Sequence, residues 1–160
     1  MRLTEEKIEP GTLAAIEGAA VEGAELIGVR ADATPLQIVT AVNRFVRNEQ
    51  KGYSERVDNW NDRALPLGSL WGCQLVRQFG WEWAAVIFHE HGDSKAIGVF
   101  TKDRSLAVYP WHFIFGCLEN NATVTIVLSF NMVAAGGIAA EEAYAYVNLM
   151  ERVHHIVPPP

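Results

Sequence analysis

The stretch that decides the fold is LPLGSLWGCQLVRQFG, residues 65–80, which runs directly into WEWAAVIFHE, residues 81–90. The first part predicts a helix, because Trp71, Leu75 and Phe79 fall in one arc when successive residues are placed about 100° apart. A glycine closes this part, as glycine commonly does at the end of a helix. The rest of the chain is expected to supply helical cover for the sheet that begins here.

Two glycines, Gly68 and Gly72, lie on the apolar side of this predicted helix. Glycine costs a helix about 1 kcal/mol relative to alanine. Two glycines on the buried side therefore predict that the sheet or another helix backbone approaches closely at this point.

The segment that follows predicts a strand that is apolar on both faces. One face carries Trp83, Ala85 and Ile87, and the other carries Ala84, Val86 and Phe88. Two apolar faces are typical of a central strand that is covered on both sides.

More strands are expected after it. Short turns join residues 81–90 to strand-like segments at 96–101 and 105–109, and short turns imply antiparallel neighbours. Residues 123–130 alternate between apolar and mostly polar side chains, which predicts a half-buried strand. The expected fold class is α+β, with an antiparallel sheet of about four strands and helices packed mainly on one face.

Helices are expected at four further places. Residues 34–37 (Thr-Pro-Leu-Gln) form a capping-box pattern with proline at the first helical position. A short helix is expected over 111–118 and a last helix over 138–153. Near the N-terminus the pattern is weakest, with a short helix near 13–20 and a strand near 25–30.

Composition favours one globular domain, because the 160 residues are 49% hydrophobic and 20% charged. Residues 1–33 are the segment of least certain structure, and residues 158–160 predict a frayed polyproline end. The formal net charge of -6 argues against binding to nucleic acid or to an anionic membrane, since both need a basic surface. Residues 122–140 carry no charge, but their polar side chains and glycine pair predict a strand and a loop, not a membrane span.

Cys73 and Cys117 both lie in apolar surroundings. Such surroundings are typical of reduced thiols in a cytosolic protein, with a disulfide between the two as the alternative. The first ten residues lack the basic and apolar regions of a secretory signal. We therefore expect a cytoplasmic protein.

Several of these markers occur together in a recognisable order: Leu67-Gly68, Gly72, Gly80, Trp83 and Pro110. Over about residues 36–133 the chain resembles a family of small bacterial α+β domains of unknown function. The resemblance implies the fold and supplies no catalytic residues. Small acidic bacterial proteins of this build also resemble toxin-neutralising immunity proteins, which is an analogy of class.

The residues His89, His91 and Asp93 form the sharpest cluster of metal-ligand types. On a strand, both histidines point to one face, where they can share a divalent transition metal that Asp93 or His112 completes. The alternative is the end of a strand, where the chain leaves the core and polar residues reach the surface. No other cofactor is expected.

Aromatic residues outside the expected core are the second hint of function: Trp60, Tyr53, Trp111 and Tyr146. Tryptophan and tyrosine are enriched where proteins bind one another, so these four are the predicted binding surface. For some of them, packing in a tryptophan-rich core is the alternative.

The leading hypothesis is a non-catalytic, acidic protein-binding module, because the chain is negatively charged and no motif assembles a catalytic set. Its expected partner is another protein, such as a basic one, or a second copy of the chain. One alternative is a metal-dependent enzyme that uses His89 and His91. Another is a structural homo-oligomer that pairs through the second apolar face of the last helix.

Overall fold

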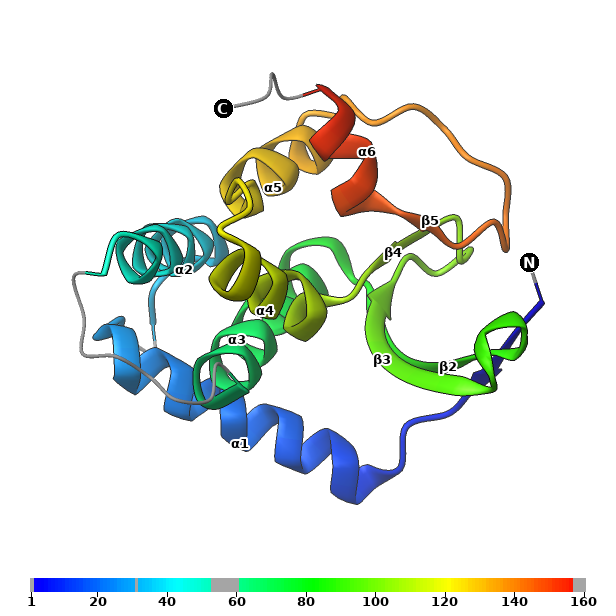
Figure 1. Cartoon of the computed structure of the whole chain (residues 1–160), viewed down its shortest axis with the longest axis horizontal. Helices are drawn as coiled ribbons and strands as arrows, with labels where there is room; N and C mark the ends of the chain where they lie inside the picture. Colours follow the sequence, from blue (N-terminus) through cyan, green and yellow to red (C-terminus); the bar gives the residue numbers. More distant parts are fainter. Residues whose placement is uncertain (1, 31, 53–60, 157–160) are drawn as a thin grey trace.

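The computed structural model describes residues 2–30, 32–52 and 61–156. Within these ranges the chain forms an α+β fold with a five-stranded sheet and six α-helices. Figure 1 shows the helices gathered on one side of the curved strands β2 and β3. The predicted α+β class is therefore confirmed.

The sheet has the strand order β1-β2-β3-β4-β5. Its strands are β1 (Leu3–Glu6), β2 (Glu82–Phe88), β3 (Ser94–Phe100), β4 (Leu106–Val108) and β5 (Val147–Asn148). The first three pairings are antiparallel, and β5 pairs with β4 in parallel. The sheet is thus mixed and has five strands, so the expected purely antiparallel sheet of about four strands is wrong. The strands β1 and β5 are short, and β1 is mostly polar, so neither shows a hydrophobic period in the sequence.

The helices are α1 (Pro10–Ile27), α2 (Pro35–Gln50), α3 (Asn61–Phe79), α4 (Pro110–Asn120), α5 (Ile126–Ala134) and α6 (Leu149–Ile156). The predicted central helix is confirmed as α3, and Trp71, Leu67 and Leu75 are among its fully buried side chains. The main core lies between α3, the other helices and one face of the sheet, which contributes Trp83 and Val99.

The two glycines of α3 make the close approaches that the sequence predicts. A Cβ atom at Gly72 would overlap the ring of Trp83, and one at Gly68 would overlap Trp111 and lie 2.9 Å from its backbone nitrogen. These two indole rings stack on each other, with centroids 6.0 Å apart. The part of the sheet that contacts α3 at Gly72 is therefore the side chain of Trp83.

The predicted strand at 123–130 is wrong, because α5 begins at Ile126. The buried residues there are Thr125, Ile126, Ser129 and Phe130, which have helical spacing. Leu128, which alternation placed with the buried side chains, is 42% exposed. Alternating β-branched residues fit both periods over such a short stretch, and packing of α5 against α2 decides between them.

The expected last helix over 138–153 is also wrong in its first half. Residues 136–146 follow an irregular path, which Figure 1 shows as a long connection around the edge of the fold, and α6 starts only at Leu149. We call residues 136–146 the strap. At the other end of the chain, α1 continues to Ile27 and ends at Gly28 with φ of 70°, so the expected strand near 25–30 is wrong.

Several local predictions are confirmed. Thr34 and Gln37 form the capping box, with Gln37 N donating to Thr34 Oγ1 at 3.2 Å and Thr34 N to Gln37 Oε1 at 2.9 Å. The short helix after Pro110 is α4. Both cysteines are free, so the alternative of a disulfide does not apply. No helix in the described ranges is long and apolar enough to span a membrane.

Candidate functional site

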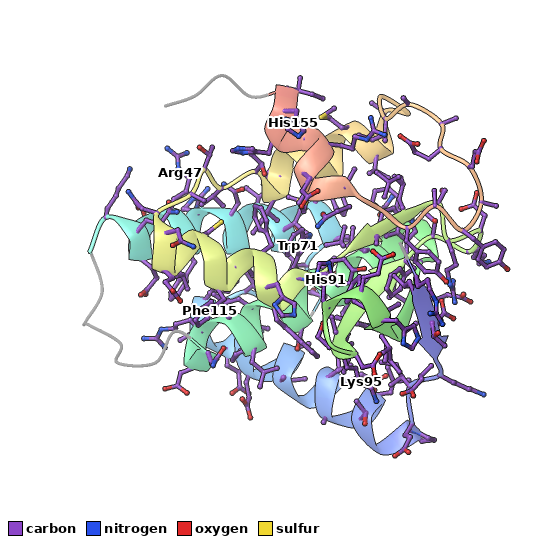
Figure 2. All side chains as sticks on the ribbon, turned by 45° about the vertical axis from the view of Figure 1, so that its right-hand side comes forward. Arg47, Trp71, His91, Lys95, Phe115 and His155 are labelled. Carbon is purple, nitrogen blue, oxygen red and sulfur yellow. The ribbon has the colours of Figure 1, made fainter. Side chains whose placement is uncertain are left out.

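A large hollow of the described structure has a volume of about 1060 Å³. It lies between the sheet face opposite the main core, α4, α6 and the end of the strap. We call this hollow the trough. Figure 2 labels His155, which lies on its α6 side, and Lys95, which lies on its β3 side.

Aromatic rings form the floor of the trough. Tyr109 lies against Phe88, with ring centroids 6.1 Å apart, and against Phe100, at 5.9 Å. Tyr146 packs on the other side of Phe100, at 5.7 Å. The ring of Tyr109 lies over Gly98, where a Cβ atom would come within 2.9 Å of Tyr109 Cδ1. The lack of a side chain at Gly98 therefore allows the Tyr109 ring to pack against the sheet.

Two helices form the walls, and each presents one face. From α4 come His112, Phe113, Gly116, Cys117 and Asn120, and from α6 come Met150, Glu151, His154 and His155. These spacings place each set along a single helix face. A Cβ atom at Gly116 would meet nothing within 4 Å, so the α4 wall is recessed at this position.

The hydroxyl of Tyr109 is the notable polar group of the floor. No residue in the described part of the chain forms a hydrogen bond with it, although the phenol is half-buried. Burial, with a smaller contribution from Tyr146, raises the pKa of Tyr109 to about 12. The group is therefore a neutral phenol at physiological pH, able to donate a hydrogen bond.

Charged groups contribute little to the lining. Lys95 Nζ forms an ion pair with Glu6 Oε2 at 2.7 Å, and Glu151 is the other charged side chain among the described residues of the trough when its histidines are counted as neutral. Cys117 also lines it, and burial raises the pKa of this thiol to about 12. The Cys117 sulfur is thus a thiol and not a thiolate nucleophile at neutral pH.

An arginine-centred cluster fixes Tyr146, which lines the trough at the end of the strap. Arg104 Nε and Nη2 donate to the two carboxylate oxygens of Glu5 at 2.6 and 3.2 Å, and Nη1 donates to Glu82 at 2.7 Å. The Tyr146 hydroxyl donates to the same Glu5 carboxylate at 3.2 Å. The Arg104 hydrogen bond outweighs burial and lowers the pKa of Glu5 below its ordinary 4.5.

The backbone supports the same junction. Tyr146 N donates to Arg104 O at 2.9 Å, and both residues have positive φ, 48° and 59°. Such conformations are strained for residues other than glycine and persist where the surroundings hold them. The junction of the strap with the sheet is thus held by side-chain and backbone bonds together.

The predicted metal ligands lie elsewhere and do not share a strand face. Strand β2 ends at Phe88, and His89 to His91 form a short 3-10 helix, η1 (His89–His91). His89 is bonded on both ring nitrogens, to Thr4 Oγ1 at 2.6 Å and to Asp93 Oδ1 at 2.7 Å. His91 contacts the ring of Phe88, with centroids 6.5 Å apart. The predicted geometry, with both imidazoles on one strand face, is therefore wrong.

Metal-ligand side chains do not gather elsewhere in the described ranges either: no group of three or more His, Cys, Asp or Glu residues there has the geometry to hold a metal ion. The metal site remains a prediction from the sequence.

The four aromatic residues of the predicted binding surface do not form one patch. Trp111 donates its indole N–H to Ser69 Oγ at 2.9 Å and lines a smaller hollow of about 420 Å³ with Leu65 and Phe115. Tyr146 lines the trough. Tyr53 and Trp60 lie outside the described residues.

Sequence reasoning missed Tyr109 and Gly116 as site residues. Tyr109 carried one usable signal, because it directly precedes Pro110, between the strand expected at 105–109 and the helix expected over 111–118. Gly116 carried none, since a single glycine in a short helix has no preferred interpretation.

Comparisons with known protein families, with curated proteins and with solved structures give no match to this chain. The resemblance to a family of small bacterial domains therefore stays a prediction. What the site does must be inferred from its own geometry.

Proposed function

We propose that the protein is a non-catalytic binding protein and that the trough receives a small molecule with an apolar, aromatic body. The observation that carries this proposal is the hollow of about 1060 Å³ with rings on its floor and helix faces as its walls. Ligand pockets are commonly about 300–1,000 Å³, mostly apolar, with a few polar groups that fix the orientation of the ligand. The trough has this composition.

Binding is favoured over catalysis by the state of the groups that line the trough. A nucleophile needs an adjacent base or a lowered pKa. Two candidate side chains, Cys117 and Tyr109, show the opposite, because desolvation in the fold raises the pKa of each to about 12. Neither has a hydrogen-bonded base among the described residues.

The protein partner that the sequence predicts is the second candidate occupant. A protein partner would place its protruding side chains in the trough beside Tyr146. Trp111, the other described aromatic residue of the predicted surface, lines the smaller hollow instead. Because the two described aromatics of the predicted surface line separate hollows, a small molecule is the better match to the trough.

A fluorescence titration with the neutral dye N-phenylnaphthylamine tests the proposal. The dye emits strongly only in an apolar environment, so the protein should bind it saturably with one site per chain. Gly116→Leu adds a side chain that projects from α4 into the trough, and it should weaken binding at least about tenfold, since excluding the ligand costs more than 1.4 kcal/mol.

Gly18→Leu is the matched control. Gly18 also lies in a helix and also has open space around its Cβ position, but it is on the exposed side of α1. Its dye affinity should equal that of the parent. Equal dye affinity in Gly116→Leu and the parent would contradict the proposed site.

A further inference from the structure

We infer that Tyr109 selects the ligand of the trough, and that this ligand is an uncharged aromatic molecule with a carbonyl-type hydrogen-bond acceptor. The inference rests on the proposed function, because it names the chemistry of the molecule that the trough receives. Tyr109 would act as the donor that orients the acceptor, while the surrounding rings hold the aromatic body.

Tyr109 is held in place by its neighbours. Its ring contacts Phe88, Phe100 and, at 6.5 Å between centroids, His112. It also lies directly over Gly98. A phenol fixed on three sides loses little side-chain entropy when a ligand binds, which is the condition for a specific hydrogen bond.

The hydroxyl of Tyr109 has an unused donor. The Tyr146 hydroxyl donates a hydrogen bond to Glu5, and the Trp111 indole N–H donates one to Ser69. The Tyr109 hydroxyl has no partner within the described ranges, and it is not among the polar atoms that are sealed in the core. A half-buried phenol loses part of its hydration without gaining a hydrogen bond to the protein. An acceptor atom of a ligand beside the Tyr109 hydroxyl would supply that missing hydrogen bond.

The charges of the lining favour an uncharged ligand. Among the described residues that line the trough, Lys95 and Glu151 are the charged groups when His112, His154 and His155 are counted as neutral. Lys95 is already paired with Glu6 at 2.7 Å, and no guanidinium from the described part of the chain lines the hollow. An anionic ligand would therefore lose its hydration without meeting an unpaired cation, which is unfavourable in an apolar site.

Two dyes of similar size separate this inference from the proposed function. Prodan is an uncharged naphthalene with a ketone acceptor, whereas N-phenylnaphthylamine is uncharged and has no carbonyl. We expect Tyr109→Phe to weaken Prodan binding about three- to tenfold, the usual effect of one neutral hydrogen bond, and to leave N-phenylnaphthylamine binding unchanged.

Tyr144→Phe is the matched control, because Tyr144 is 72% exposed and does not line the trough. It should bind both dyes as the parent does. Gly116→Leu should weaken both dyes, which reports on the trough itself.

Each outcome decides one claim. If both dyes bind in a manner that Gly116→Leu weakens, but Tyr109→Phe binds Prodan as tightly as the parent, the inference about Tyr109 is overturned and the proposed function stands. If anilinonaphthalene sulfonate, the anionic analogue, binds more tightly than N-phenylnaphthylamine, the inference that the ligand is uncharged is overturned. If Gly116→Leu affects neither dye, the proposed function fails and the inference fails with it.

Discussion

Arg104 and Glu5, 99 positions apart in the sequence, form a two-pronged ion pair with nitrogen–oxygen distances of 2.6 and 3.2 Å. The pair joins the edge strand β1 to the turn before β4, and the strap is bonded to both partners through Tyr146. The short N-terminal strand and the side of the trough formed by Tyr146 are therefore coupled through one carboxylate.

Replacing Arg104 with alanine should destabilise the protein. The Arg104 side chain is 13% exposed and donates to Glu5, to Glu82 and to Thr101 O, so its removal leaves two carboxylates without their shared cation. We expect a loss of about 2–3 kcal/mol in the free energy of unfolding, measured by urea denaturation. Arg30→Ala is the control, because the Arg30–Asp32 pair is at the surface and should contribute less than about 1 kcal/mol. Equal losses in the two variants would show that the cluster is not structural.

Acid should remove part of this stabilisation. The folded pKa of Glu5 is lowered, first by its hydrogen bond to Arg104, so its contribution is present above the unfolded value near 4.5 and is lost as pH falls through the folded value. The parent should therefore be more stable than Glu5→Gln at neutral pH, and the difference should shrink on acidification below that unfolded pKa. Urea denaturation of both proteins across this pH range measures the difference. A gap that widens toward acid would reverse the predicted sign.

The two helix glycines that differ in their surroundings should respond oppositely to alanine. At Gly72 a methyl group overlaps the Trp83 ring, which is itself stacked on Trp111, so Gly72→Ala should cost about 1–3 kcal/mol. At Gly116 the methyl group meets open space, so Gly116→Ala should gain up to about 1 kcal/mol from helix propensity. Thermal unfolding separates the two signs, at about 2–4 °C per kcal/mol for a chain of this size.

Removing metal ions should leave the fold unchanged. Both ring nitrogens of His89 are occupied by Thr4 and Asp93, and in the described ranges no third ligand completes a site. We expect the same melting temperature with and without a chelator. The metal hypothesis would gain support if native mass spectrometry of protein purified without chelator showed a bound transition metal that His89→Ala removes.

The sequence predicted those elements whose signal is local. The helix around Trp71 has a full apolar arc, and the capping box at Thr34 is a complete four-residue pattern, so both could be placed without tertiary information. Residues 123–130 could not, because a short alternating run of β-branched residues fits a strand until packing of Ile126 and Phe130 selects the helix.

The trough could not be predicted from local patterns, for a related reason. Its floor and walls come from β2 and β3, from Tyr109 with α4, and from the end of the strap with α6. The parallel pairing of β5 with β4 brings α6 beside the sheet, where it meets the other two segments. A two-residue strand gives no periodic signal, so the sequence does not predict that these segments lie together.

An amide NMR titration of the full chain with N-phenylnaphthylamine tests the central claim most directly, because it locates the bound dye. The largest shifts should fall on residues of all three sides of the trough, such as Ala96, Gly116 and Met150, and Gly116→Leu should abolish them. Shifts centred on the hollow beside Trp111, or on the outer face of α1, would contradict it.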